Sequence, residues 1–344
     1  MDVFGNQARK GLEMKIKNLL KNEGPTDHLD EFGMAVLTGL SSTPKTISSK
    51  FFYDDYGSEL FKKITGAPDY YVTSTEFSIL KQLASTLPAL IGGNTIDIIE
   101  LGAGDGHKSK LLIDGFLDFD FKVNYYPVDI SEQAMLFLQN NFTESSKLEV
   151  HGVVADYFTG LSHLRALSNN RQLVLFLGST IGNFDRTQTE DFLRRIWKSM
   201  NPEDFILIGF DQKKDIPVLN KAYNDSEGFT ERFNLNLLTR INRELGGNFL
   251  IQKFKHYGFY NPLKGAMESH LVSLEEQEVT IRDLKKTFRF SKFESIHLEY
   301  SFKFLPSEID VLCRETGFTG VGHFKDEKAW FVDSLWKVVK SPTS

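Results

Sequence analysis

Residues 95–106 read TIDIIELGAGDG, an apolar run that ends in three closely spaced glycines. A short apolar run bounded by such a turn predicts a buried strand. Gly102, Gly104 and Gly106 predict a tight turn in which the backbone can approach a ligand closely. Residues 108–116, KSKLLIDGF, then resume as a helix. This order is typical of an α/β fold that binds a ligand at the turn, and a plain strand–helix turn is the alternative.

The same alternation continues towards the C-terminus. Further strands are expected at 122–131, 148–158, 171–184 and 204–211, and further helices at 131–142 and 187–200. Parallel strands covered by helices on both faces are buried on both sides, which explains their continuous apolar runs. The pattern therefore predicts the fold class α/β, with a doubly wound, Rossmann-like sheet.

The segments before and after this alternating core follow other patterns. We expect helices over 10–22, 28–40, 75–90 and 215–247, antiparallel strands within 248–304, and a final helix and strand in the tail. Thr73 and Glu76 have the spacing of a capping box at the start of the third of these helices. We predict a cofactor-binding domain at 75–213 plus 303–344, and an inserted α+β substrate-binding domain at 1–74 plus 214–302.

Composition excludes several classes of protein. The chain has 344 residues, a net charge of −6 and one cysteine, Cys313, so it is neither a bulk nucleic-acid binder nor a disulfide-stapled secreted domain. The N-terminal residues lack the apolar segment of a signal peptide, and no apolar run is long enough for a membrane span. We expect a cytoplasmic enzyme, acting as a monomer on a small molecule, with no nucleic-acid or membrane partner.

Polar residues at the predicted strand ends favour an adenosine cofactor. The glycines follow a Gly-x-Gly-x-Gly spacing, which differs from the dinucleotide fingerprint. Asp129 ends the second strand, where an acid can bind ribose hydroxyls, and Asp156 with Tyr157 ends the third, beside the expected adenine. Lys108 lies in the first turn after the glycines and could meet a cofactor carboxylate, or else be solvated. Together these positions predict S-adenosylmethionine.

Longer motifs extend through most of the chain. They are Phe52-Tyr53-Asp54 with Gly57-Ser58 and Phe61, Pro68-Asp69-Tyr70-Tyr71, Glu100-Leu101-Gly102-Ala103-Gly104, Pro127-Val128-Asp129, 176–183 (FLGSTIGN), Ala222-Tyr223-Asn224, Phe233-Asn234, 241–245 (INREL), Glu299-Tyr300-Ser301 and Lys303-Phe304. In these motifs the chain resembles the histidine-specific Nα-methyltransferases of ergothioneine biosynthesis.

The resemblance implies successive transfer of methyl groups from S-adenosylmethionine to the α-amino group of L-histidine. The product would be Nα,Nα,Nα-trimethylhistidine (hercynine), in the first step of ergothioneine biosynthesis. The resemblance assigns cofactor contacts to Tyr53, Gly102, Lys108, Asp129, Asp156 and Tyr157. It assigns histidine contacts to Tyr70, Asn183, Tyr223, Glu299 and Ser301, with Tyr53, Asn183 and Tyr223 positioning the reactants. It implies no metal and identifies no general base.

The residues themselves support part of this assignment. Glu299 and Ser301 are two apart on a predicted strand, so their side chains share a face, with Tyr300 on the other. A carboxylate and a hydroxyl on one face could hold the two nitrogens of an imidazole; a solvated strand face is the alternative. Aromatic rings such as Tyr53, Tyr70 and Phe61 suit a methylated cation.

Other readings stay open at this point. The main alternative is an Nα-methyltransferase of tryptophan or a tryptophan derivative, because Ser269 is smaller than the family pattern leads us to expect near the substrate. The loop residues Asp105-Gly106-His107 also depart from that pattern. A protein or nucleic-acid methyltransferase would be expected to have a basic surface. A non-catalytic cofactor-binding protein would be expected to have a degraded glycine loop or to lack Asp129.

Overall fold

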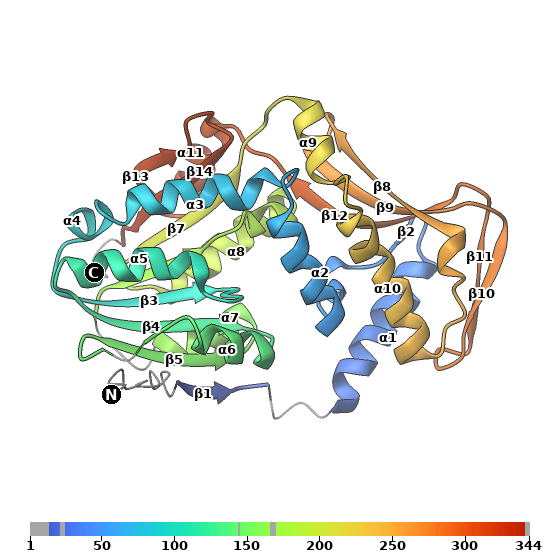
Figure 1. Cartoon of the computed structure of the whole chain (residues 1–344), viewed down its shortest axis with the longest axis horizontal. Coiled ribbons are helices and arrows are strands. Elements are labelled where there is room, and N and C mark those ends of the chain that lie inside the picture. Colours follow the sequence, from blue (N-terminus) through green and yellow to red (C-terminus); the bar gives the residue numbers. More distant parts are fainter. Residues whose placement is uncertain (1–13, 21–24, 144, 166–169, 341–344) are drawn as a thin grey trace, which may run out of the picture.

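The computed structural model describes residues 14–20, 25–143, 145–165 and 170–340, and it contains a large sheet and a smaller one (Figure 1). The large sheet has the strand order β1-β5-β4-β3-β6-β7-β14-β13. In this sheet β1, β5, β4, β3, β6 and β7 run parallel to one another, and β14 is antiparallel to both β7 and β13. The strands are β1 (Lys15–Asn18), β3 (Thr95–Leu101), β4 (Lys122–Asp129), β5 (Leu148–Val154), β6 (Gln172–Phe176), β7 (Phe205–Asp211), β13 (Phe318–Lys325) and β14 (Phe331–Val338).

Helices cover both faces of this sheet, which confirms the predicted doubly wound architecture. Buried side chains of one face pack with α3 (Tyr71–Leu83), α4 (Leu87–Ile91), α5 (His107–Asp118) and α6 (Glu132–Gln139). Those of the other face pack with α7 (Tyr157–Arg165), α8 (Arg186–Ser199) and α11 (Pro306–Glu315). The central strands β3, β6 and β7 are buried on both sides, as their continuous apolar sequences predict.

A smaller sheet with its own hydrophobic core lies at the right of Figure 1. Its order is β2-β12-β9-β8, and a separate hairpin is formed by β10 and β11. These strands are β2 (Lys45–Thr46), β8 (Phe254–Asn261), β9 (Ala266–Ser273), β10 (Gln277–Ile281), β11 (Lys286–Phe290) and β12 (Ser295–Phe302). The accompanying helices are α1 (Pro25–Ser41), η1 (Ser49–Phe52), α2 (Asp55–Gly66), α9 (Ile216–Ala222), α10 (Phe229–Leu245) and η3 (Ile251–Lys253).

Two local predictions were wrong. Residues 15–18, expected in a helix, form the edge strand β1, because the sequence KIKN pairs in parallel with the otherwise open edge of β5; residues 10–13 and 21–22 lie outside the described residues. The helix expected over 75–90 begins at Tyr71 and ends at Leu83, so Thr73 and Glu76 form no capping box. Glu76 is buried instead and serves tertiary contacts.

Helix α7 and the strands β11 and β13 were not predicted, because short segments carry weak periodicity. The division of the chain into 75–213 plus 303–344 and 1–74 plus 214–302 stays a prediction, and β1 lies in the large sheet. Among the residues that the structure describes, every helix is too short or too polar to span a bilayer.

Candidate active site

The glycine turn after β3 forms an open cradle. Gly102, Gly104 and Gly106 have φ angles of +76°, +53° and +69°, which side-chain-bearing residues rarely adopt. A Cβ atom on Gly102 would lie 3.3 Å from the Tyr157 hydroxyl, whereas a Cβ on Gly104 would meet no atom within 4 Å. The turn therefore combines a backbone that needs glycine with free space in front of it, as a bound cofactor requires.

Asp129 lies beside this cradle at the end of β4. Its Oδ2 accepts a hydrogen bond from the Gly104 amide (3.1 Å), and its Oδ1 accepts one from the Ser131 amide (2.9 Å). Burial raises the pKa of Asp129, and the hydrogen bonds from these amides oppose that rise. The carboxylate is thus held in place next to the glycine turn, where it can bind ribose hydroxyls.

Asp156 and Tyr157 lie at the end of the adjacent strand β5. The Asp156 carboxylate accepts from the backbone amides of Phe158 (2.9 Å) and Thr159 (3.1 Å), so it caps helix α7. Both residues line a hollow of about 380 Å³, together with Phe158, Phe184, Gln188, Asp191 and Phe192. This aromatic hollow is close to the glycine turn, because the Tyr157 ring reaches Gly102. Its position and lining suit an adenine ring.

Lys108 is not free in this structure. Its ammonium forms an ion pair with Glu76, whose side chain is fully buried. The other oxygen of Glu76 accepts a hydrogen bond from the Gly178 amide (2.6 Å). Lys108 therefore ties α5 to α3 and to the loop after β6, and any contact with a cofactor carboxylate would compete with Glu76.

Glu299 and Ser301 lie on the inner face of the smaller sheet, as the sequence predicts. On β12 they are opposite Ser269 and Met267 of β9, whereas Tyr300 is opposite Glu268 on the outer face. The pairing register shifts between His297 and Glu299, so a β-bulge precedes the pair. Burial raises the pKa of Glu299 to about 7, although the nearby Lys303 lowers it.

A buried ion pair lies next to Ser301. The Lys303 ammonium lies 2.8 Å from Oδ2 of Asp211, and both side chains are fully buried. Asp211 also accepts from the Tyr71 hydroxyl (2.7 Å) and pairs with Lys214. Burial opposes the ionisation of Asp211, but these two lysines outweigh it and hold its pKa below the usual value. The network joins the end of β7 in the large sheet to β12 in the smaller one.

The same lysine determines how Ser301 can hydrogen-bond. Lys303 donates to the Ser301 hydroxyl oxygen and to the Tyr223 hydroxyl oxygen, each at 2.9 Å. The Tyr223 hydroxyl in turn donates to Ser301 Oγ at 2.7 Å. A serine hydroxyl has two lone pairs and one hydrogen, and both lone pairs are used here. Ser301 is therefore left with its O–H group as a donor.

Two further tyrosines lie between the cofactor side and the substrate side. Burial, followed by the charge of Glu299, raises the pKa of Tyr53 well above its usual value, and Asp129 contributes as well. Although protein atoms surround it closely enough to shift this pKa, Tyr53 keeps 41% of its surface exposed, so it borders open space. Its ring packs edge-on against Phe61 at 5.4 Å. Burial also raises the pKa of Tyr70, whose ring lies 6.4 Å from that of Tyr223.

Asn183 is exposed at the end of the short helix η2 (Thr180–Asn183). The preceding Gly182 packs so closely on β12 that a Cβ atom there would come within 2.8 Å of the Phe302 carbonyl oxygen. The loop after β6 therefore lies against the strand that carries Glu299 and Ser301. This packing brings Asn183 to the same region as the predicted histidine contacts.

Asp211 and Lys303 are parts of this region that were not predicted from the sequence. The signal available was weak: Asp211 ends an apolar strand, and Lys303 is one charged residue beside apolar neighbours. Such residues are more often exposed, and only the pairing of Phe304, just after β12, with the end of β7 buries them as a pair.

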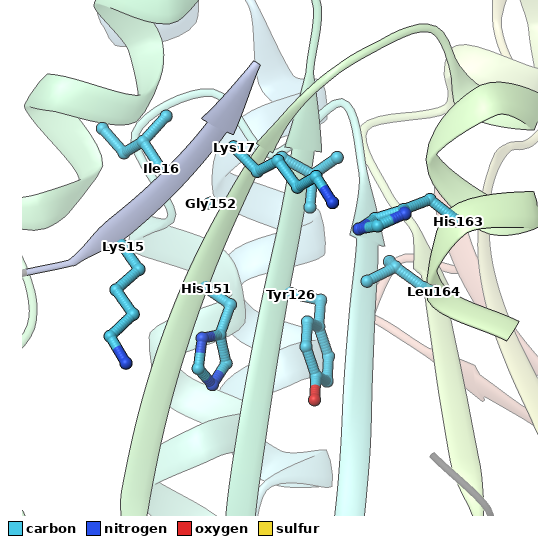
Figure 2. A pocket seen from close by; sticks show the side chains of 9 residues that line it. Lys15, Ile16, Lys17, Tyr126, His151, Gly152, His163 and Leu164 are labelled. Carbon is cyan, nitrogen blue, oxygen red and sulfur yellow. The ribbon is translucent and has the colours of Figure 1, made fainter. Parts of the chain in front are cut away.

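A second hollow, of about 300 Å³, lies at the β1 edge of the large sheet (Figure 2). It is formed by β1, β4, β5 and α7, and none of the predicted site residues lines it. Figure 2 shows basic and aromatic side chains around it, including Lys15, Lys17, Tyr126 and His151. It plays no part in the site described above.

Comparisons with known proteins find relatives that match most of the chain. A family model described as "Histidine-specific methyltransferase, SAM-dependent" matches residues 32–338. The histidine N-alpha-methyltransferase of Mycolicibacterium smegmatis is 33% identical over 301 residues, covering 87% of this chain and 92% of that protein.

More distant relatives carry other names. Ergothioneine biosynthesis protein 1 of Schizosaccharomyces pombe is 30% identical over 278 residues, which cover 78% of this chain and 35% of that protein. The 4-dimethylallyltryptophan N-methyltransferase of Claviceps fusiformis is 26% identical over 305 residues, covering 82% of this chain and 85% of that protein.

Proposed function

Because the chain belongs to the family of S-adenosylmethionine-dependent, histidine-specific methyltransferases, we propose that it methylates the α-amino group of L-histidine. Transfer is repeated until Nα,Nα,Nα-trimethylhistidine (hercynine) is formed, and the name of the Schizosaccharomyces pombe relative supports a place in ergothioneine biosynthesis. A cytoplasmic location and a monomeric state are part of the same proposal. The observation that carries the substrate assignment is the pair of Glu299 and Ser301.

The imidazole is held in one tautomer. Ser301 can only donate, so it donates to the imidazole nitrogen that carries a lone pair. Glu299, as a carboxylate, accepts from the N–H of the other nitrogen. An imidazolium would present N–H groups to both side chains and leave the Ser301 hydrogen without an acceptor. The site therefore selects neutral imidazole.

The cofactor side fits S-adenosylmethionine, which supplies an electrophilic methyl group when bound. Asp129 receives the ribose and Asp156 with Tyr157 receives the adenine, while the open space at Gly104 accommodates close approach to the backbone. Tyr53 lies near both Asp129 and Glu299, so it borders both ligands. Holding the two reactants in line is the main contribution that such a site makes to the rate.

The α-amino end of histidine faces hydroxyl and amide groups. Asn183 and Tyr70 bind the substrate carboxylate, and Tyr223 lies beside them. The pKa values of Tyr53, Tyr70 and Tyr223 are raised by burial, so their hydroxyls stay protonated and act as donors at neutral pH. An α-amino group is largely protonated at neutral pH and must lose a proton before each attack. These tyrosines could accept that proton only as phenolates, which form above their raised pKa values.

The direct test is incubation of the protein with S-adenosylmethionine and each standard amino acid, read by mass spectrometry. Histidine should gain three methyl groups at long incubation, all on the α-nitrogen. A reaction that stops at one methyl, marks an imidazole nitrogen or uses another amino acid instead of histidine would refute the proposal.

A tryptophan derivative is the second candidate substrate. The observation that favours it is Ser269, a small buried residue opposite Glu299 that leaves room for a larger ring. The polar pair Glu299 and Ser301 favours histidine, because an indole has one N–H and no nitrogen acceptor. The same incubation, extended to tryptophan and 4-dimethylallyltryptophan, distinguishes the two.

Histidine should bind more weakly as the pH falls below about 7. Burial raises the pKa of Glu299 to about 7, with Lys303 opposing the rise, so the accepting carboxylate is present above this pH and is lost below it. The other titratable groups near Glu299 are Tyr53, Tyr70 and Tyr223, which stay neutral because their pKa values are raised further. Protonation of the substrate imidazole, with a pKa of about 6.5, acts in the same direction.

Calorimetry with S-adenosylhomocysteine present, between about pH 6 and pH 8, measures this histidine affinity. The Glu299→Gln variant has no titrating carboxyl, so it should keep the step caused by the imidazole and lose the one near 7. An identical pH profile in both proteins would show that Glu299 does not accept from the substrate.

Asp129→Ala should weaken binding of S-adenosylhomocysteine at least tenfold, because two ribose hydroxyls would lose a charged acceptor worth roughly 1.5–3 kcal/mol. Titration calorimetry measures the change, and Glu149→Ala, at an exposed position of β5, provides a control that should bind normally. Unchanged affinity in Asp129→Ala would remove Asp129 from the cofactor site.

A further inference from the structure

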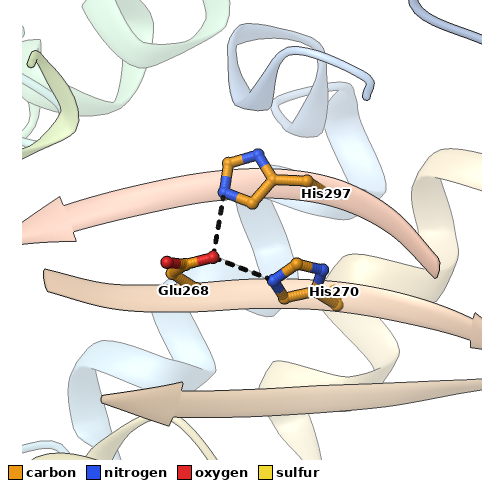
Figure 3. Close-up of side chains that lie close together, drawn as sticks. All are labelled: Glu268, His270 and His297. Atoms are coloured by element: carbon orange, nitrogen blue, oxygen red, sulfur yellow. Dashed lines mark hydrogen bonds and ion pairs between the residues drawn. The ribbon is translucent and has the colours of Figure 1, made fainter. Parts of the chain in front are cut away.

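Two histidines and a glutamate meet on the outer face of the smaller sheet. Glu268 and His270 lie on β9, and His297 lies opposite His270 on β12. Nε2 of His270 is 3.1 Å from Oε2 of Glu268, and Nε2 of His297 is 3.9 Å from the same oxygen. Figure 3 shows both imidazoles directed at this carboxylate from neighbouring strands.

The cluster leaves one buried nitrogen without a partner. Nε2 of His297 is inaccessible to solvent and makes no hydrogen bond with any residue that the structure describes. At 3.9 Å it is too far from Glu268 for a hydrogen bond, and an unpaired buried nitrogen is unfavourable. The other glutamate oxygen, Oε1, is occupied by Asn261 Nδ2 at 2.8 Å. Oε2 and both Nε2 atoms therefore converge on one point, where a bound cation would replace the hydrogen bond between His270 Nε2 and Glu268 Oε2 and give His297 Nε2 a partner.

We propose that Glu268, His270 and His297 bind a divalent first-row transition cation, with Zn²⁺ as the best match. Two imidazole nitrogens and one carboxylate oxygen form a known zinc ligand set, whereas Mg²⁺ and Ca²⁺ prefer oxygen ligands. All three ligand atoms lie within 4.8 Å of one another. The separations of 3.1 and 3.9 Å lie on either side of the roughly 3.3 Å expected for tetrahedral zinc.

Neighbouring side chains hold the ligands in place. The ring of His270 stacks on Phe259, with centroids 5.6 Å apart, and the ring of His297 packs against Tyr300 at 4.1 Å. Asn261 fixes the orientation of the Glu268 carboxylate. Neighbours of this kind orient the ligands of metal sites in proteins.

The position of the cluster indicates a structural role. The bulge between His297 and Glu299 places His297 on the outer face and Glu299 on the inner face, opposite Ser269. A cation bound to β9 and β12 at this point would hold the register of the two strands. The strand pair that presents Glu299 and Ser301 would thereby be stabilised from its outer face, without contact between the cation and the substrate.

The experiment uses full-length protein without a polyhistidine tag, stripped of metal by a chelator. Zn²⁺ is titrated by calorimetry and Co²⁺ by visible absorption. We expect about one equivalent of Zn²⁺ with micromolar or tighter affinity, Co²⁺ bands typical of low coordination number, and a melting temperature that rises by several degrees with Zn²⁺. His297→Gln and Glu268→Gln should each weaken Zn²⁺ binding at least tenfold.

The matched control is His151→Gln. His151 and Glu149 have the same spacing on a strand as His270 and Glu268, with Nε2 and Oε2 3.2 Å apart, but they lie on β5 and outside the cluster. This variant should bind Zn²⁺ like the wild type. Absence of saturable binding, wild-type affinity in His297→Gln, or loss of binding in His151→Gln would overturn the proposal. The Co²⁺ spectrum of the wild type decides the matter if a cluster variant fails to fold.

Discussion

Glu299→Ala should lower kcat/KM for histidine by about tenfold to several hundredfold. The carboxylate lies on the inner face of β12 next to Ser301, and its removal leaves an imidazole N–H without an acceptor. An unpaired buried polar group costs about 1–3 kcal/mol, and more when the lost partner is charged. Binding of S-adenosylhomocysteine should change little, because Asp129 and the glycine turn lie in the large sheet. Steady-state kinetics and calorimetry measure the two effects.

Two comparisons make this prediction specific. Glu299→Gln keeps the volume and a carbonyl acceptor, so it should lose less activity than Glu299→Ala. The alanine variant also opens space beside the small Ser269, and tryptophan should become a better substrate relative to histidine. If Glu299→Ala methylates histidine at the wild-type rate and affinity, the strand face is merely solvated and the substrate assignment must be revised.

Asp211→Asn should lower the free energy of unfolding by about 3–5 kcal/mol, because removing one partner of a buried ion pair leaves an uncompensated charge. The side chains of Asp211 and Lys303 are fully buried, and Lys214, also paired with Asp211, is nearly so. The neutral amide has the same shape as the carboxylate but leaves two buried ammonium groups without an anion. Urea denaturation followed by circular dichroism measures the change.

The neighbouring Lys213 provides a control for this prediction. Its ammonium pairs with Glu308 at 2.8 Å, but both side chains are partly exposed. Lys213→Met should therefore change stability by less than about 1 kcal/mol, as is usual for solvent-exposed pairs. Equal losses in Asp211→Asn and Lys213→Met would mean that burial of the Asp211 network adds nothing to stability.

The large sheet could be predicted because its signals are local. The apolar run at 95–101 and the three glycines after it require a buried strand and a turn with positive φ angles, and the structure has both. Asp129 and Asp156 could be placed at one end of the sheet because parallel strands bring their carboxyl ends to the same edge. The i, i+2 spacing of Glu299 and Ser301 likewise predicted their shared face, which the strand register confirms.

Features that depend on distant segments could not be predicted in this way. Residues 15–18 form a strand because β5 offers an open edge, and Glu76 leaves its expected capping role because Lys108 and the Gly178 amide reach it. No local pattern distinguishes these outcomes from a solvated helix or a helix cap.

The sequence by itself therefore determined the fold class, the glycine turn and the shared face of Glu299 and Ser301, because periodicity and glycine geometry act over a few neighbouring residues. The tertiary structure alone decided which way these groups hydrogen-bond. Lys303 and Asp211 are far apart along the chain, and only the pairing of Phe304, just after β12, with the end of β7 buries them together next to Ser301. That burial leaves Ser301 as a donor, because Lys303 and Tyr223 occupy both lone pairs of its hydroxyl.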